Sequence, residues 1–109
     1  MRLIDTTSNL SLHGIRLLNG RPPGNGGAIQ SGPGANLTLI NSTVSLSFAG
    51  GSGGGIDAQG AVALINSTVY GNTAVGAGGG INVGPSGSVT ATAATIDSNT
   101  TSAGSGTDA

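Results

Sequence analysis

The side chains that could perform acid–base chemistry are few in this sequence. Its 109 residues contain four Asp, three Arg and one His, and they contain no Cys, Lys or Glu. An enzyme that hydrolyses glycosidic bonds needs two carboxyl groups about 5 to 9.5 Å apart. The only carboxylates available are Asp5, Asp57, Asp97 and Asp108. Because the four occupy different phases of an internal repeat, we expect no two of them on one face, and we predict no catalytic residues and no enzymatic activity.

The other candidates for ligand binding are the histidine and a glycine run. His13 is the only histidine, and we expect it on the surface. The run Gly50–Gly55 resembles the calcium-binding GGxGxD repeat of toxins, but Gly55 stands where the carboxylate belongs. A phosphate-binding loop would need a following helix N-terminus or a lysine. We therefore predict neither a metal site nor a cofactor site.

The composition excludes several classes of protein. With 22 Gly and only seven charged residues, the chain cannot form an amphipathic helix bundle. An apolar fraction of 36% and a mean hydropathy of +0.17 argue against a disordered chain. The net charge of -1 gives nucleic acid no electrostatic reason to bind. We expect neither an export signal nor a membrane span in this segment, because Met1–Leu10 has no apolar stretch of the signal-peptide type and the sequence has no run of 18 apolar residues.

An internal repeat of 25 to 27 residues organises the chain. The sequence GGAI at Gly26–Ile29 recurs as GGGI at Gly53–Ile56 and at Gly78–Ile81. In the same phase, NLTLINSTV at Asn36–Val44 recurs as AVALINSTV at Ala61–Val69. Self-similarity at such a period is typical of a solenoid. We predict one segment over residues 1–109 with four units, at about 1–25, 26–52, 53–77 and 78–105.

Each unit predicts one rung, meaning one turn, of a coil. Apolar residues alternate with small polar ones over three to five residues, which is the pattern of a half-buried strand, and turn-forming residues follow each such stretch. Since one rung cannot bury a core alone, rungs stack about 4.8 Å apart with their strands parallel. The predicted fold is all-β, a right-handed parallel β-helix (β-solenoid) of about four rungs with three short strands each.

The alternation also assigns the faces of the strands. The residues predicted to point inward are Leu10, Leu12, Leu17, Ile29, Leu37, Leu39, Val44, Ile56, Val62, Leu64, Val69, Ile81, Val89 and Ile96. Asn41 and Asn66 share one phase at the end of a strand, and we expect them to point inward as an asparagine ladder. Asn72 and Asn99 are expected to form turns. Both pairs are interpreted as structural.

One outward column, meaning a set of equivalent positions in successive rungs, could bind a regular surface. It consists of Thr43, Thr68 and Thr95, preceded by Arg16 and flanked by Ser42 and Ser67. A flat Thr array on a β-solenoid resembles the ice-binding face of some antifreeze proteins. Because Thr is also common at solvent-facing strand positions, we expect ice binding only as a minor alternative.

Two sequence elements resemble the repeat of the polymorphic membrane proteins and related bacterial surface β-helix proteins. Gly26–Ile29 matches the GGA-aliphatic element. VYGN at Val69–Asn72 and IDSN at Ile96–Asn99 match the second element, with Val and Ile where the family prefers Phe, and Ser47 replaces the Asn in the second unit. The resemblance implies a pectin-lyase-like β-helix that is secreted or displayed on a bacterial surface, and it leaves the activity open because this fold carries many.

Three functions are consistent with these observations. We expect a non-enzymatic structural or adhesin-like segment, a fragment of a longer solenoid like an autotransporter passenger. A carbohydrate or host-surface ligand, and a second copy bound at the open ends, are the partners that this interpretation allows. The alternative is a fragment of a carbohydrate-active β-helix enzyme, a polysaccharide lyase or hydrolase, whose catalytic rungs lie elsewhere. The minor alternative is an ice-binding solenoid.

Overall fold

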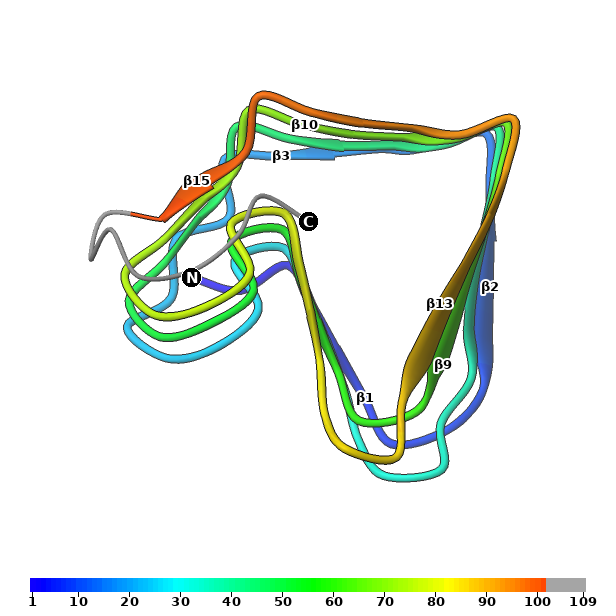
Figure 1. The fold of residues 1–109 in the computed structure, drawn as a ribbon, viewed down its shortest axis with the longest axis horizontal. Coiled ribbons are helices and arrows are strands. Elements are labelled where there is room, and N and C mark those ends of the chain that lie inside the picture. The colour runs from blue at the N-terminus through cyan, green and yellow to red at the C-terminus, as the bar shows by residue number, and fades with distance from the viewer. Residues whose placement is uncertain (102–109) are drawn as a thin grey trace.

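Parallel strands wound into four successive rungs make up residues 1–101, the part of the chain that the computed structural model describes (Figure 1). These residues contain no helix. Each strand pairs only with its equivalents in the preceding and following rungs, so the sheets run along a coil and do not close into a barrel. The predicted β-solenoid is therefore confirmed.

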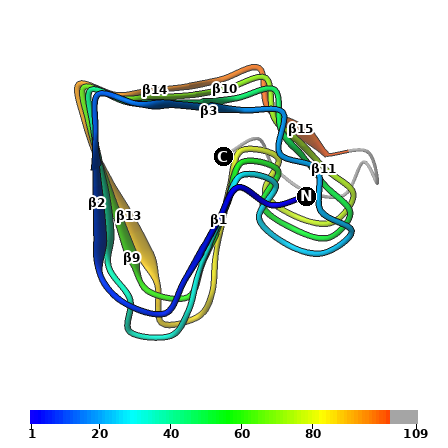
Figure 2. The ribbon, with the colours of Figure 1, turned by 180° about the vertical axis from the view of Figure 1, so that it is seen from behind.

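Three sheets form the sides of the coil, which Figures 1 and 2 show from its two ends. The first sheet contains β1 (Ile4–Thr6), β4 (Ile29–Ser31), β8 (Ile56–Ala58) and β12 (Ile81–Val83). The second contains β2 (Leu10–His13), β5 (Leu37–Ile40), β9 (Ala61–Ile65) and β13 (Ser88–Thr92). The third contains β3 (Arg16–Leu18), β6 (Thr43–Ser45), β10 (Thr68–Tyr70) and β14 (Thr95–Asp97).

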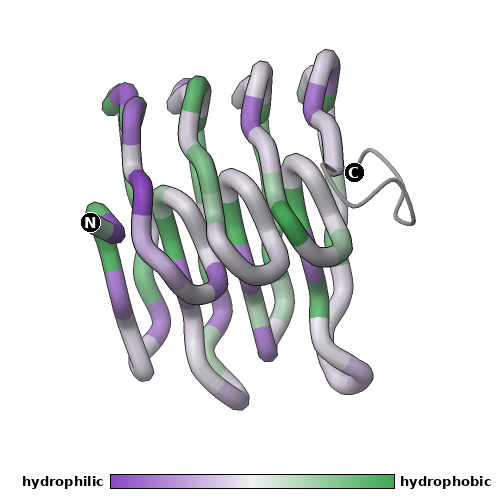
Figure 3. Tube along the Cα trace, turned by 90° about the vertical axis from the view of Figure 1, so that its left-hand side faces the viewer, coloured by the Kyte–Doolittle hydropathy of each residue, from purple (hydrophilic) through white to green (hydrophobic). Residues whose placement is uncertain are grey.

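The structure has a fourth, smaller sheet, which the sequence analysis, with three strands per rung, does not predict. It contains β7 (Phe48–Ala49), β11 (Thr73–Ala74) and β15 (Thr100–Thr101). Strands of two residues are too short to show an alternating pattern. Three stacked loops project from one corner of the coil, at residues 19–28, 46–55 and 71–80, and we call these loops the glycine lobe (Figures 1 and 3). β7 and β11 belong to the second and third loops, and β15 pairs with β11 in the following rung.

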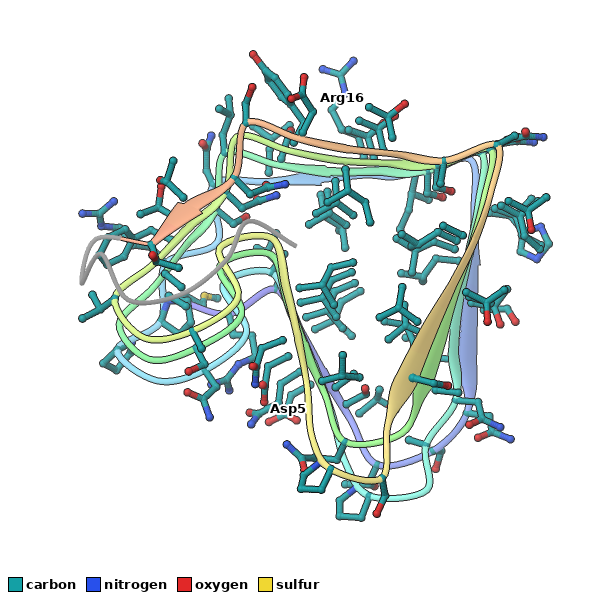
Figure 4. The ribbon with its side chains drawn as sticks, in the orientation of Figure 1. Asp5 and Arg16 are labelled. Carbon is teal, nitrogen blue, oxygen red and sulfur yellow. The ribbon has the colours of Figure 1, made fainter. Side chains whose placement is uncertain are left out.

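The register of the sheets follows the sequence repeat. Ile4, Ile29, Ile56 and Ile81 are successive partners, so equivalent positions step by 25, 27 and 25 residues. The four isoleucines form one of four apolar stacks that fill the coil (Figure 4). The other stacks are Leu10–Leu37–Val62–Val89, Leu12–Leu39–Leu64–Ala91 and Leu17–Val44–Val69–Ile96.

Burial within these stacks depends on the rung. All members in the two inner rungs are at most 1% exposed, which confirms the predicted inward faces. In the last described rung, Val89 is 38% and Ile96 is 36% exposed although both keep the inward register. An end rung is covered on one side only, and this accounts for the difference.

The turns between strands rest on left-handed backbone conformations. Between the second and third sheets, the residues Gly14, Asn41, Asn66 and Ala93 have φ from +48° to +64°. After the third sheet, Asn19, Leu46, Gly71 and Ser98 have φ from +54° to +67°. Such a residue interrupts the in–out alternation, so the chain changes direction and the next side chain points inward.

The glycine lobe packs backbone against backbone. A Cβ on Gly54 would lie within 2.6 Å of the carbonyl group of Thr73, and a Cβ on Gly79 would lie within 2.7 Å of the backbone of Thr100. The amides of Gly53, Gly54 and Gly55 donate to carbonyl groups of the next loop at 2.9 to 3.0 Å. The loops can stack at this spacing because glycine has no side chain to separate them.

The turns between the first and second sheets differ in length from rung to rung. They comprise residues 7–9, 32–36, 59–60 and 84–87. The strands on both sides nevertheless keep their register with the neighbouring rungs. Some steps between equivalent positions are 27 residues long and others 25. The two residues of difference are added in these turns.

Candidate functional site

The structure places two aspartates in one outward column, and this corrects the prediction that no two would share a face. Asp5 and Asp57 lie on the first sheet in a column that reads Asp5, Gln30, Asp57 and Asn82. The equivalence was missed because the first unit lacks the GG marker, although Ile4-Asp5 repeats as Ile56-Asp57. Asp97 lies on the third sheet, and Asp108 lies outside the described residues.

Asp57 is buried beneath the glycine lobe. Its side chain is 1% exposed, and Asn82 Nδ2 donates a hydrogen bond of 2.8 Å to Asp57 Oδ1. Asp57 Oδ2 has no hydrogen-bond partner among residues 1–101. The turn at Gly53 lies directly against it, since a Cβ at Gly53 would lie 2.9 Å from the Cα of Asp57. A polymeric substrate cannot reach this carboxylate.

Asp5 lies at the exposed end of the same column, on the outer side of β1 toward the lobe (Figure 4). Arg2 Nη1 lies 3.5 Å from Asp5 Oδ2. The same guanidinium donates through Nε to the carbonyl groups of Asn25, at 2.9 Å, and of Gly26, at 3.3 Å. Arg2 thus joins the first rung to the first loop of the lobe.

The geometry of the two carboxylates does not suit glycoside hydrolysis. Asp5 and Asp57 are separated by two rungs, or about 9.6 Å at the usual strand spacing, which is at the upper limit for an inverting pair. Gln30 occupies the rung between them. Because Asp57 is covered, no sugar ring can lie between the two carboxyl groups.

The asparagine ladder exists, but at other residues than predicted. Asn41 and Asn66 are exposed, with φ of +51° and +48°. They form the corner themselves, and the expectation of inward side chains was wrong because the left-handed residue breaks the alternation. The side chains that point inward are the next ones, Ser42 and Ser67, which were predicted outward and are 3% and 2% exposed.

Asn72 and Asn99 form the ladder, although they were expected only to form turns. Both are fully buried, and Asn72 Nδ2 donates to Asn99 Oδ1 at 3.0 Å. Asn99 Oδ1 also accepts from the backbone amide of Asn72, and Asn72 Oδ1 accepts from that of Ser47 at 3.0 Å. Ser47 Oγ accepts from the amide of Gly20 at 3.1 Å, so the ladder passes through all four rungs.

A shorter serine ladder runs along the neighbouring corner. The amide of Ser42 donates to Ser67 Oγ at 3.1 Å, and the amide of Ile15 donates to Ser42 Oγ at 3.3 Å. Each hydroxyl donates back to a carbonyl group of its own rung, at Ile40 and Ile65. The signal that sequence offers is the residue type before three of the ladder residues: Asn41, Asn66 and Gly71, which favour the left-handed conformation, directly precede Ser42, Ser67 and Asn72.

The predicted Thr column is confirmed in register. Arg16, Thr43, Thr68 and Thr95 are successive partners on the third sheet. The adjacent outward column on the same sheet contains Leu18, Ser45, Tyr70 and Asp97, and the Tyr70 side chain is 46% exposed. A projecting tyrosine beside the Thr column gives this sheet an uneven surface, which does not match a flat ice lattice.

The remaining candidates lie apart from one another. His13 is exposed, as predicted, and it shares an outward column with Ile40, Ile65 and Thr92. Within residues 1–101, no three His, Cys, Asp or Glu side chains come together, and the surface has no pocket. None of the described segments is a helix long and apolar enough to cross a membrane.

Comparisons with protein-family models, with curated protein sequences and with solved structures found no match. The contacts described above therefore provide the evidence on function. They show buried polar side chains that bond one rung to the next, and they show exposed columns made mainly of small residues.

Proposed function

We propose that this chain is a non-enzymatic structural segment, a rod of the stalk-like or adhesin-like kind. The observation that carries the proposal is the ladder from Gly20 through Ser47 and Asn72 to Asn99. Its side chains bond the backbone of the preceding rung, so each buried polar group stabilises rung-to-rung contact. Together with the apolar stacks, this arrangement resists separation of the rungs along the coil axis.

We also propose that the rod lies outside a bacterial cell, either secreted or displayed on the surface. Its support is the resemblance of the GGAI and VYGN elements to surface β-helix repeats. The low number of charged residues and the small polar side chains outside the coil are compatible with a passive, displayed rod.

Stretching the full chain by its two ends with an optical trap tests the mechanical role. We expect unfolding in steps of one rung, each releasing about 80 to 90 Å of contour length for about 25 residues. Asn72→Ala should lower the force of these steps clearly, while Asn41→Ala should lower it much less. Unfolding of the whole chain at low force in the parent and in both variants would contradict a mechanical role.

The alternative function, a piece of a polysaccharide lyase or hydrolase whose catalytic rungs lie elsewhere, also predicts that this chain alone is inactive. A polysaccharide assay therefore tests whether residues 1–109 are themselves catalytic. Incubation of the chain with acidic and neutral polysaccharides should produce neither unsaturated ends nor new reducing ends. Product formation that disappears in Asp5→Asn would overturn the structural proposal, since Asp5 is the exposed carboxylate of the first-sheet column.

A further inference from the structure

Two large side chains, Leu46 and Tyr70, are exposed on the third sheet and at the corner that follows it. Leu46 is 56% and Tyr70 is 46% exposed. They lie in the second and third rungs, each of which has a described rung on both sides, so a missing neighbour does not account for their exposure. The other outward positions of the third sheet in these rungs hold Thr43, Ser45 and Thr68. An exposed aromatic ring and leucine among such small residues mark a candidate binding surface.

The two side chains belong to adjoining positions of neighbouring rungs. The Leu46 amide donates a hydrogen bond of 3.2 Å to the carbonyl group of Tyr70. The Leu46 side chain also leans toward the third rung, since a Cβ on Gly71, the residue after Tyr70, would lie 3.1 Å from Leu46 Cδ2. Glycine at this position therefore leaves room for the leucine. We call Leu46 and Tyr70, together with the Gly71 backbone, the apolar platform.

The backbone of the platform is strained at Leu46. Its φ of +54° lies in the left-handed region, which a leucine seldom adopts. The equivalent positions in the first and third rungs hold Asn19 and Gly71, which tolerate this conformation. An exposed leucine gains no packing in the core that would offset the strain. Strained residues of this kind are concentrated at ligand sites, which favours a binding role for Leu46.

Polar groups border the platform. Ser45 and Asp97 are the partners of Tyr70 in the rungs on either side, and the outward column beside it contains Arg16 and Thr68. Arg16 projects from the outer side of the third sheet (Figure 4). The strand spacing places these groups in steps of about 4.8 Å along the sheet. The sheet thus presents a small apolar area bordered by hydroxyl groups and by one charge of each sign.

These features suit a sugar chain better than a protein. A stable protein interface takes about 20 to 30 residues a side around an apolar core, whereas the platform has two large side chains. A pyranose ring has an apolar C–H face, which packs on an aromatic ring, and a rim of hydroxyl groups, which bond polar side chains. Because the surface of residues 1–101 has no pocket, the ligand must be extended and lie across the rungs.

We propose that the apolar platform binds a neutral, β-linked oligosaccharide of hexopyranose units. One sugar ring packs on Tyr70 and against Leu46, and the adjoining rings lie over the Thr column. A neutral chain fits because the two bordering charges, Arg16 and Asp97, are opposite in sign. No bond of the sugar is formed or broken. The inference rests on the proposed function in so far as it gives an adhesin-like rod its ligand.

Tyrosine fluorescence reports on this site directly, because Tyr70 is the only tyrosine and the chain has no Trp. The probe is cellohexaose, a β-linked glucose hexamer. Titration of the full chain should change the fluorescence in a saturable way, with a Kd on the order of 1 mM for a contact open to water. Maltohexaose, the α-linked isomer, which coils, should bind about fivefold or more weakly.

Leu46→Asn separates binding from stability. The variant keeps the fluorophore and relieves the strain, so it should bind cellohexaose about fivefold more weakly while its thermal unfolding midpoint does not fall. Val75→Asn, at a valine of the glycine lobe that is 40% exposed, is the matched control and should bind as the parent does. Isothermal titration calorimetry extends the series to Tyr70→Phe, which should keep the binding, and to Tyr70→Ala, which should lose it.

Several results would overturn the sugar site. They are a parent whose fluorescence does not respond to cellohexaose, equal binding of both hexamers, and binding by Leu46→Asn or Tyr70→Ala at parental strength. A fluorescence change that follows protein concentration without sugar would also overturn it, and would identify the platform as a contact between copies. Circular dichroism verifies the coil in each variant. Failure of sugar binding leaves the stepwise unfolding of a single chain unaffected, so the rod proposal is tested separately.

Discussion

Asp57 is a formal negative charge enclosed between two amide side chains. Asp57→Asn should raise the free energy of unfolding by about 1 kcal/mol or more, because it removes a buried charge and supplies an amide that can donate to Gln30 in the column. Urea denaturation measures the change. Asp5→Asn, at the exposed end of the column, should change the unfolding free energy by less than about 0.5 kcal/mol. Destabilisation by Asp57→Asn would show that the carboxylate itself is required.

Leu46 is a large apolar residue in a conformation that favours glycine or asparagine. Its φ is +54° and its side chain is 56% exposed. Leu46→Asn should stabilise the chain by about 1 kcal/mol, since asparagine tolerates the left-handed region. The midpoint of thermal unfolding measures the change. The control is Leu18→Asn, at an exposed leucine within strand β3, and it should not raise the midpoint.

The ladder residue Asn72 should be far less replaceable than the corner residue Asn41. Asn72→Ala leaves the buried amide of Ser47 without an acceptor and should cost about 2 to 4 kcal/mol in urea denaturation. Asn41→Ala should cost about 1 kcal/mol, the strain of its φ. Similar losses at the two positions would contradict the ladder assignment.

At the scale of the element, the glycine lobe depends on close backbone contact. Gly54→Ala should prevent the loops from stacking and abolish the cooperative thermal transition, because its Cβ would meet the Thr73 carbonyl. Gly24→Ala is the control, since its Cβ would meet only the end of the Arg2 side chain at 3.5 Å. A normal melting curve for Gly54→Ala would show that the loops are free to separate.

The strand faces give a second prediction at this scale. Leu64→Asp places a charge in the dry centre of the coil and should abolish folding, whereas Thr68→Asp, outward on β10 of the same rung, should have little effect. Far-UV circular dichroism distinguishes the outcomes.

The sequence alone was sufficient for the strands of the first three sheets but not for the two-residue strands of the fourth sheet or for the corners. Repeated blocks such as LTLINSTV and VALINSTV determine the register and the inward stacks, because strand alternation has a fixed period of two. At a left-handed residue that period is interrupted, so Asn41 and Ser42 were assigned to the wrong sides. Asp5 was placed out of phase because only Ile4, and no glycine pair, marks the first unit.

For the whole molecule, protection should follow the number of neighbouring rungs. Amides in residues 26–77 should exchange more slowly with deuterium than those in 1–20 and 78–101, since inner strands have partners on both sides. Residues 102–109, which the repeat also predicts to be weakly protected, lie outside the described residues. Uniform exchange along residues 1–101 would contradict a solenoid in which each rung is stabilised mainly by the rungs next to it.

The turns between the first and second sheets, which differ in length, provide a position where a foreign peptide can be inserted. Turns of different length, including residues 32–36 and 59–60, join strands whose register is the same on both sides. A peptide epitope or an affinity tag grafted between Pro33 and Gly34, both exposed, would therefore be displayed on an outer corner without shifting the rungs. The coil could then serve as a display scaffold in which each rung offers one graft position.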